Sequence, residues 1–291
     1  MRRRLGILLL LVGVGAVTAP PVAQADDPLV YVALGDSFTS GPLVPLPTGN
    51  PADCGQSTVN YPRLVAEALQ VDVFRDISCG GATIDDFYEP QGPLVLGGVN
   101  PPQFDALHAD VDVVTVGISG NDVGFVGLAF DCARLLGPPF EQPCTPNYTG
   151  GGVDRVSERI SRVGEELGQA LRDLRHRAPN AEVFVVGYPT SLPHNAVACW
   201  PYIPILPADM PYLVAKFQEM NAMIAAQAAA SGATYVDVYT SSIGHDVCQL
   251  PGVAWVNGLV VVPLSAPAHP NELSFRNTAR QVTAAIRSLG A

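Results

Sequence analysis

The sequence has little charge of either sign, and this scarcity excludes several classes of protein. Only 15% of the 291 residues are charged, whereas 48% are hydrophobic, a composition too apolar for an intrinsically disordered chain. Acidic residues outnumber basic ones by 27 to 16, so the net charge is −11. Such a surface repels phosphate groups, and the sequence has no basic stripe interleaved with aromatic residues. We therefore expect no nucleic-acid partner.

Motifs that mark other enzyme classes are also missing. The sequence contains no GxSxG, the motif that places the nucleophile in α/β-hydrolases. It contains neither GxGxxG nor GxxxxGK[ST], which argues against a bound dinucleotide or nucleoside triphosphate. HExxH and CxxC are absent as well, so we expect no metal site.

The first 25 residues have the pattern of a removable export signal. Three arginines, Arg2–Arg4, precede the short apolar run Leu5–Thr18, and Ala23-Gln24-Ala25 has the small-x-small pattern of a cleavage site. We predict a signal peptide over residues 1–25, cleavage near Ala25 and a secreted, extracellular mature chain over residues 26–291. An uncleaved membrane anchor is the less favoured alternative, because the apolar run is shorter than the about 20 residues that span a bilayer.

The cysteines are even in number and widely spaced along the predicted mature chain. In an exported protein this pattern indicates disulfides rather than a metal site. Many pairings are compatible with the sequence. We favour pairing in sequence order because it joins neighbouring loops without threading the chain: Cys54 with Cys79, Cys132 with Cys144 and Cys199 with Cys248.

Short apolar runs alternate along the chain with longer amphipathic stretches. The short runs have the length and composition of strands buried on both faces: Leu29–Leu34, Val71–Ile77, Asp112–Ile118, Glu182–Gly187 and Thr234–Val238. The longer stretches carry apolar residues at helical spacing: Tyr61–Leu69, Val153–Arg177, Pro211–Ala230 and Pro270–Leu289. This alternation predicts an α/β fold in which helices sandwich a parallel sheet. Pro- and Gly-rich segments predict surface loops on a single domain: Pro42–Gly55, Gly137–Gly152 and Pro189–Pro211.

Small polar residues follow three of the predicted strands, where the carboxyl ends of a parallel sheet gather reactive groups. Ser37 lies in GDSFTSG, Gly81 in CGGAT and Asn121 in SGND. His269 lies in APAHPN, directly before the last predicted helix. A nucleophilic serine, two additional hydrogen-bond donors and a histidine base are the minimum set for acyl transfer through an oxyanion.

These four blocks, in this order, resemble those of the SGNH hydrolase family, the GDSL esterases and lipases, and in particular its secreted actinobacterial lipase-like members. The resemblance covers nearly the whole predicted mature chain. It implies a three-layer α/β/α sandwich of the flavodoxin-like type, hydrolysis of carboxylic esters without a cofactor, and three disulfides paired in sequence order. It also implies that Ser37 is the nucleophile and His269 the base. The backbone N–H groups of Ser37 and Gly81 and the side-chain amide of Asn121 would form the oxyanion hole.

The histidine block departs from the family pattern. Many members have aspartate three residues before the histidine, whereas Ala266 stands there in this chain. We therefore predict a Ser37/His269 dyad in which the backbone carbonyl of Ala266 accepts a hydrogen bond from the imidazole and orients it. A helix directly after His269 would keep the ring neutral through its dipole. His245, beside an acidic residue, is the competing base, less favoured because adjacent side chains in a loop rarely face each other.

The apolar segment after Asn121 bears on the substrate. Phe125 and Phe130 lie in this segment, which would either line an acyl pocket or belong to the core. We predict a monomeric, secreted esterase or lipase that acts on a small-molecule or lipid ester. Two alternatives remain: a deacylase of carbohydrate or other small esters, and a catalytically silent binding protein on the same fold.

Overall fold

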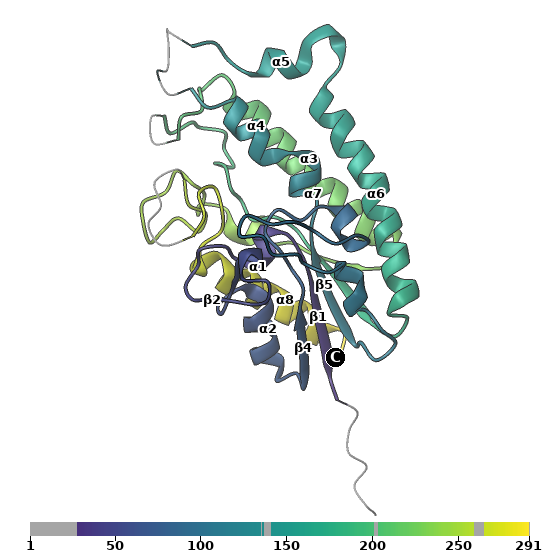
Figure 1. Ribbon diagram of the computed structural model, residues 1–291. Coiled ribbons are helices and arrows are strands. Elements are labelled where there is room, and N and C mark those ends of the chain that lie inside the picture. The colour runs from purple at the N-terminus through teal and green to yellow at the C-terminus, as the bar shows by residue number, and fades with distance from the viewer. Residues whose placement is uncertain (1–27, 135, 137–140, 201–202, 259–264, 291) are drawn as a thin grey trace, which may run out of the picture.

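A parallel sheet forms the centre of the protein in the computed structural model (Figure 1), which describes residues 28–134, 136, 141–200, 203–258 and 265–290. The predicted signal peptide lies outside these residues. The sheet has five strands in the order β4-β1-β5-β6-β7, and each neighbouring pair is parallel. The strands are β1 (Val30–Gly35), β4 (Val73–Asp76), β5 (Val113–Gly117), β6 (Glu182–Val186) and β7 (Thr234–Val236). Four of the predicted apolar runs contain one of them, and the run Leu29–Leu34 stops one residue before the end of β1, so the strand predictions are confirmed.

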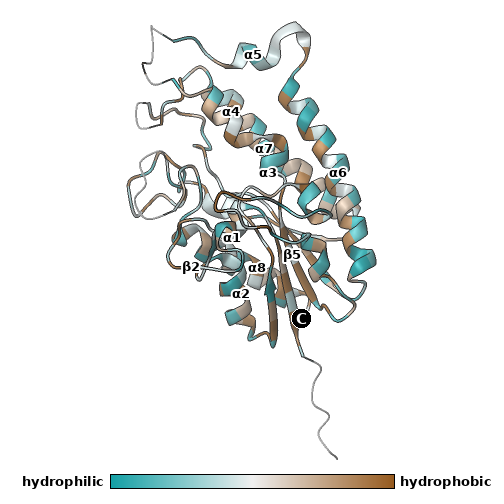
Figure 2. Cartoon of the chain, in the orientation of Figure 1, coloured by the Kyte–Doolittle hydropathy of each residue, from teal (hydrophilic) through white to brown (hydrophobic). Residues whose placement is uncertain are grey.

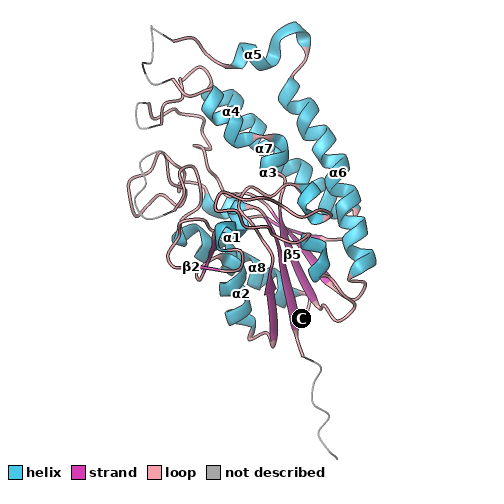
Figure 3. Ribbon diagram, in the orientation of Figure 1, coloured by secondary structure: helices cyan, strands magenta, loops and turns pink. Residues whose placement is uncertain are grey.

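Long helices cover both faces of the sheet (Figure 3). α2 (Tyr61–Leu69) and α8 (Glu272–Ser288) pack on one face, and α6 (Arg155–Arg177) and α7 (Met210–Ala230) pack on the other. Successive residues of β1 alternate between the two cores: Val32 belongs to the core under α6 and α7, whereas Tyr31 belongs to the core under α2 and α8. The predicted three-layer α/β/α sandwich is therefore confirmed.

Local sequence signals explain where the helices begin. The side chains of Asn60, Asp154 and Asn271 accept hydrogen bonds from backbone N–H groups in the first turns of α2, α6 and α8, and such a cap typically contributes about 1 kcal/mol. The helices alternate hydrophilic and hydrophobic residues, whereas the strands are mostly hydrophobic (Figure 2). No helix in the described part of the chain is long and apolar enough to cross a membrane.

The strand order places a crevice at the carboxyl edge of the sheet. If the five strands of this sheet are numbered by their order in the chain, they lie side by side as 2-1-3-4-5. The connections that follow β1 and β5 therefore run in opposite directions along the sheet. Ligands bind at such a switch point. The last residues of these two strands are paired partners, Gly35 with Gly117. The loops that carry Ser37 and Asn121 therefore start side by side at the same level of the sheet.

The loops are more structured than the sequence predicts. Within the predicted loop Pro42–Gly55 lies β2 (Pro47–Thr48), which pairs antiparallel with β3 (Gln56–Ser57). The short helices are α1 (Ser37–Ser40), α3 (Gly120–Val123), α4 (Phe125–Asp131) and α5 (Thr145–Thr149), and the 3₁₀ turns are η1 (Ala52–Cys54), η2 (Ile84–Phe87), η3 (Gln103–Ala106), η4 (Gly150–Gly152) and η5 (Thr240–Ser242). These elements are too short to show a periodic pattern in the sequence.

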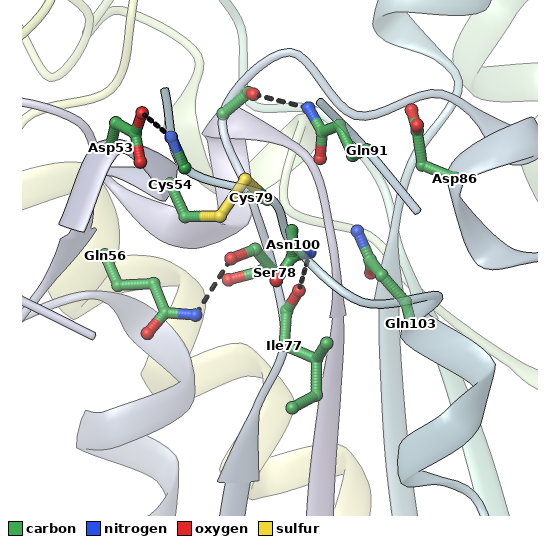
Figure 4. The surroundings of a disulfide bond; sticks show 12 residues. Asp53, Cys54, Gln56, Ile77, Ser78, Cys79, Asp86, Gln91, Asn100 and Gln103 are labelled. Carbon is green, nitrogen blue, oxygen red and sulfur yellow. Dashed lines mark hydrogen bonds between the residues drawn. A yellow bond between two sulfur atoms is a disulfide. The ribbon is translucent and has the colours of Figure 1, made fainter. Parts of the chain in front are cut away.

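Disulfides pair in sequence order, as predicted: Cys54 with Cys79, Cys132 with Cys144 and Cys199 with Cys248. The first of them joins the loop after α1 to the turn that follows β4 (Figure 4). That turn contains Gly81, so this disulfide ties two loops at the carboxyl edge of the sheet to each other.

Candidate active site

Ser37 and His269 meet at the carboxyl edge of the sheet although they lie 232 residues apart, with 2.8 Å between Ser37 Oγ and His269 Nε2. Ser37 is the first residue of α1 and is only 7% exposed. The competing histidine, His245, contacts other residues instead. The ring of His245 stacks on Trp255 with centroids 3.7 Å apart, and its Nδ1 lies 2.7 Å from the carbonyl oxygen of Val253. The structure therefore brings His269, rather than His245, to the serine.

The carbonyl that orients the imidazole is that of Pro267, which corrects our expectation for Ala266. His269 Nδ1 lies 2.7 Å from the oxygen of Pro267. The oxygen of Ala266 instead accepts the backbone N–H of His269 at 3.2 Å and closes a turn, in which Ala268 has a φ of 60°. Because a carbonyl only accepts hydrogen bonds, Nδ1 of the neutral ring carries the proton. Nε2 is then free to accept the hydroxyl proton of Ser37.

Burial lowers the pKa of His269 below its ordinary value, and the hydrogen bond to Pro267 acts more weakly in the opposite direction. We expected the dipole of the following helix to have this effect. However, α8 begins only at Glu272, after its cap Asn271. The ring is thus neutral at physiological pH, as a general base requires.

Each of the three donors predicted for the oxyanion hole has a hydrogen that is not used within the described part of the chain. Among the described residues, the backbone N–H groups of Ser37 and Gly81 have no hydrogen-bond acceptor. The side-chain amide of Asn121 donates one hydrogen to the carbonyl of Ala82 at 2.9 Å, which leaves its second hydrogen for a ligand. Asn121 and Ser37 line the same pocket. Gly81 adjoins Ala82 in the same turn, so Asn121 also ties that turn to the site.

Glycine is required at position 81 for its backbone conformation. A Cβ at this position would meet nothing closer than 3.7 Å, so lack of space is not the reason. The φ of Gly81 is instead +80°, a region that costs other residues roughly 1–2 kcal/mol.

Tyr188 is a site residue that the sequence patterns did not single out. Its hydroxyl accepts the N–H of Gly120 at 2.7 Å and donates to the buried carboxylate of Asp36. Asp36 in turn accepts the N–H of Phe38 and caps α1. Burial raises the pKa of Asp36 to about 7. The hydroxyl thus links the segment that carries Ser37 to the segment that carries Asn121; the position of Tyr188 directly after a predicted strand was the available signal.

Asp122, which could be mistaken for a catalytic acid, is engaged with the backbone. One of its carboxylate oxygens accepts the N–H of Ile84 at 2.9 Å. Burial raises the pKa of Asp122 to about 6. In the described ranges no three histidine, cysteine, aspartate or glutamate side chains gather into a group that could hold a metal ion.

Two contiguous apolar pockets extend from the serine. The inner pocket contains Ser37, Asn121 and Phe217 in its wall, and the outer pocket contains Phe130. Six residues line both pockets: Phe125, Val126, Ala129, Leu192, Val247 and Ala268. Phe125 is half-buried and packs edge-on against Phe217, with ring centroids 5.1 Å apart, whereas Phe130 is 66% exposed.

Comparison with protein families shows to which family the chain belongs. Residues 33–276 match the GDSL-like Lipase/Acylhydrolase family, a range that contains Ser37, Gly81, Asn121 and His269. The chain belongs to this family. The resemblance inferred from the sequence blocks is therefore confirmed, and membership of the family makes the protein an ester hydrolase.

Individual GDSL-family relatives match over most of the chain. Lipase 2 of Streptomyces coelicolor is 37% identical over 263 residues, which cover 88% of this chain and 85% of the relative. An extracellular lipase from Streptomyces rimosus has a crystal structure that matches with a TM-score of 0.66 at 25% identity, covering 88% of this chain and 99% of that chain. The crystal structure of phospholipase A1 from Streptomyces albidoflavus NA297 matches with a TM-score of 0.69 at 22% identity and the same coverage, which shows a shared fold.

Proposed function

We propose that this protein is a secreted serine hydrolase that cleaves lipid acyl esters through an acyl-enzyme on Ser37. The observation that carries the proposal is the relay from Ser37 Oγ to His269 Nε2 at 2.8 Å and from His269 Nδ1 to the Pro267 carbonyl at 2.7 Å. A serine hydroxyl is a weak nucleophile until an adjacent base accepts its proton. This relay holds the base in the tautomer that can do so.

The chemistry takes two steps on the same residues. Ser37 Oγ attacks the ester carbonyl while His269 Nε2 accepts the hydroxyl proton, and the histidine then gives this proton to the departing alcohol. In the second step His269 accepts a proton from water, whose oxygen attacks the acyl carbonyl. The bond from the acyl carbon to Ser37 Oγ then breaks, and His269 returns the proton to Ser37 Oγ as the carboxylic acid leaves. Both steps pass through an oxyanion that the N–H groups of Ser37 and Gly81 and the amide of Asn121 would stabilise. The Pro267 carbonyl stabilises the imidazolium less than a carboxylate would.

The apolar pockets support an acyl chain as the part of the substrate next to Ser37. Apart from the catalytic segment, Tyr188 and Ser191, the inner wall is apolar, and burial of each methylene group contributes about 0.8 kcal/mol. The hydroxyls of Tyr188 and Ser191 are already hydrogen-bonded within the protein. A sugar would require more free polar partners than these described residues offer. The names of the relatives, Lipase 2 and an extracellular lipase, agree with this assignment.

Export fits the same proposal. Three disulfides are typical of proteins that fold in an oxidising compartment, and one relative is described as an extracellular lipase. The basic and apolar pattern of residues 1–25 would supply the signal peptide.

A panel of p-nitrophenyl esters from acetate to palmitate tests the substrate and the acyl pocket together. We expect the disulfide-bonded protein to hydrolyse butyrate and longer esters, and an organophosphonate to label Ser37.

Phe130→Ala should lower kcat/KM for palmitate by roughly 3- to 10-fold, which corresponds to the loss of about 1 kcal/mol of apolar contact. The kcat/KM for butyrate should remain unchanged. The reason is that Phe130 lines only the outer pocket.

Leu289→Ala is the matched control, since Leu289 is also exposed but lies at the end of α8, outside both pockets. An unchanged palmitate-to-butyrate ratio in Phe130→Ala would remove the outer pocket from the acyl site. Activity confined to acetyl esters of sugars would favour a carbohydrate deacylase instead. Failure of both hydrolysis and Ser37 labelling would favour a silent binding protein.

The pH dependence of kcat/KM should reflect the lowered pKa of His269. Because the base acts only when neutral, activity should rise with pH through an apparent pKa below about 6.5 and then level off. Asp36 and Asp122, whose pKa values are about 7 and about 6, are two further groups beside the site that could produce such a rise. Asp36→Asn keeps an oxygen for the cap of α1, and Asp122→Asn keeps one for the N–H of Ile84. The rise should persist in both variants. A midpoint well above that of free histidine would contradict the assignment.

A further inference from the structure

The turn that carries Gly81 can present its central peptide in two orientations. The N–H of Ala82 donates to the carbonyl of Cys79 at 3.1 Å and closes the turn. The φ of Gly81 is +80°, whereas Gly80 is not at positive φ; together these define a type II turn. A type I turn would keep the same closing hydrogen bond, but its central peptide would be rotated so that the carbonyl and the N–H exchange directions. The carbonyl of Gly80 and the N–H of Gly81 belong to this peptide and point in opposite directions. The turn type therefore decides where the Gly81 N–H points.

The residues of the turn do not favour either orientation by themselves. Glycine populates positive and negative φ about equally, and glycine occupies both central positions, 80 and 81. Neighbouring segments must hold the peptide. The N–H of Gly80 donates to the carbonyl of Cys54 at 2.8 Å, and the side-chain amide nitrogen of Gln91 donates to the carbonyl of Gly80 at 2.9 Å. Figure 4 shows this amide facing the turn beside the Cys54–Cys79 disulfide.

Gln91 is itself held in place. It is 9% exposed, and its backbone exchanges two hydrogen bonds of 3.0 Å with Asn100. Asn100 in turn donates from its side chain to the carbonyl of Ile77 at 3.2 Å. The Gln91 amide has only one favourable orientation at the turn, because rotation by 180° would place its oxygen against the oxygen of Gly80.

The other end of the Gln91 amide is unsatisfied. Its Oε1 is buried and has no hydrogen-bond partner in the described part of the chain. A buried acceptor without a partner costs stability, and such groups are rare in native proteins unless they have another role.

We propose that Gln91 is a positioning residue of the oxyanion hole. By holding the Gly80 carbonyl, it locks the Gly80–Gly81 peptide in the type II orientation and aims the Gly81 N–H at the developing oxyanion. This inference rests on the proposed function. Gln91 does not touch the substrate; it acts through one peptide unit.

Two variants of nearly equal size remove the donor: Gln91→Met, which is apolar, and Gln91→Glu, which places a second acceptor against the Gly80 oxygen. Loss of an entire oxyanion donor costs about 10²- to 10³-fold. A donor that is only misdirected should cost about 10- to 100-fold in kcat, with KM changed less than about 3-fold. Binding of a trifluoromethyl ketone, whose adduct with Ser37 carries the oxyanion, should weaken by a similar factor. We expect Gln91→Glu to be at least as impaired as Gln91→Met.

Gln56 provides the matched control on the other side of the same disulfide (Figure 4). It is 5% exposed, and its amide donates to the carbonyls of Asp76 and Ser78 at 2.8 and 2.9 Å. Neither peptide contains the Gly81 N–H. Gln56→Met and Gln56→Glu should therefore lower the melting temperature at least as much as the Gln91 variants, while kcat changes less than about 3-fold.

The outcomes separate the two proposals. Gln91 variants that keep the kcat of the Gln56 variants, or whose loss of activity only follows their loss of thermal stability, would overturn the positioning role. Failure of both Gln91 variants to fold while the Gln56 variants fold would assign Gln91 to the structure and overturn it as well. If instead the parent protein cleaves no ester, or Ser37→Ala cleaves esters equally well, the proposed function itself fails, whatever the Gln91 variants do.

Discussion

Ser37→Ala is expected to lower kcat for p-nitrophenyl butyrate by about 10⁴- to 10⁶-fold. The substitution removes the oxygen that forms the acyl-enzyme in the proposed mechanism, whereas the pockets and the remaining donors are kept. KM should change little, because the apolar walls do not involve the hydroxyl. The residual rate would come from oxyanion stabilisation and substrate binding alone.

His269→Ala should cost a similar factor, and the double variant should be hardly worse than either single one. In the proposed mechanism serine and histidine act as one unit through the 2.8 Å contact, and losses within such a unit are strongly non-additive. His245→Ala is the matched control for histidine removal, since His245 is bound to Val253 and Trp255. Additive losses, or a His269→Ala variant within about 10-fold of the parent, would show that another group accepts the serine proton.

Asn121→Ala is expected to lower kcat by about 10²- to 10³-fold with a small effect on KM. The amide would bind the oxyanion more strongly than the ground-state carbonyl, so its loss affects mainly the transition state. Asn121→Asp has almost the same shape but places a negative charge against the oxyanion, and it should be worse than alanine. Steady-state kinetics on p-nitrophenyl butyrate measure both effects.

Asp122→Asn separates catalysis from local structure. Asp122 is adjacent to Asn121 in the chain, and its carboxylate accepts a hydrogen bond from the N–H of Ile84. The oxygen of asparagine can preserve this bond. We expect this variant to retain kcat within about 3-fold. If Asn121→Asp is as active as the parent, the Asn121 amide is not an oxyanion donor, and its bond to Ala82 is purely structural.

The layer architecture could be predicted because it depends on patterns local to each segment. Strands such as β5 are continuous apolar runs because both of their faces are buried, and α2 begins and ends where its amphipathic pattern does. Short β2 and α4 were missed, since a few residues show no period. The pairing of cysteines in sequence order was also predictable, because each pair joins neighbouring loops.

The placement of the candidate site residues could be predicted because the topology of a parallel sheet gathers strand ends at one edge. Ser37, Gly81 and Asn121 each follow a strand, and the pairing of Gly35 with Gly117 brings two of their segments together. His269 follows no strand, and its place depended on the resemblance to the GDSL family.

The sequence was sufficient for the properties that residue type and period encode: which segments become strands and helices, which faces are buried and which residues can carry acyl-transfer chemistry. The orientation of individual groups came from the folded chain alone. Three hydrogen bonds depend on where a single carbonyl, hydroxyl or amide points: the bond of His269 to Pro267 rather than Ala266, the bond of Tyr188 to Gly120, and the bond of Gln91 to Gly80. Such directions are decided by packing between segments far apart in the chain, because the local conformations of turns and glycines differ by little energy until neighbouring segments constrain them.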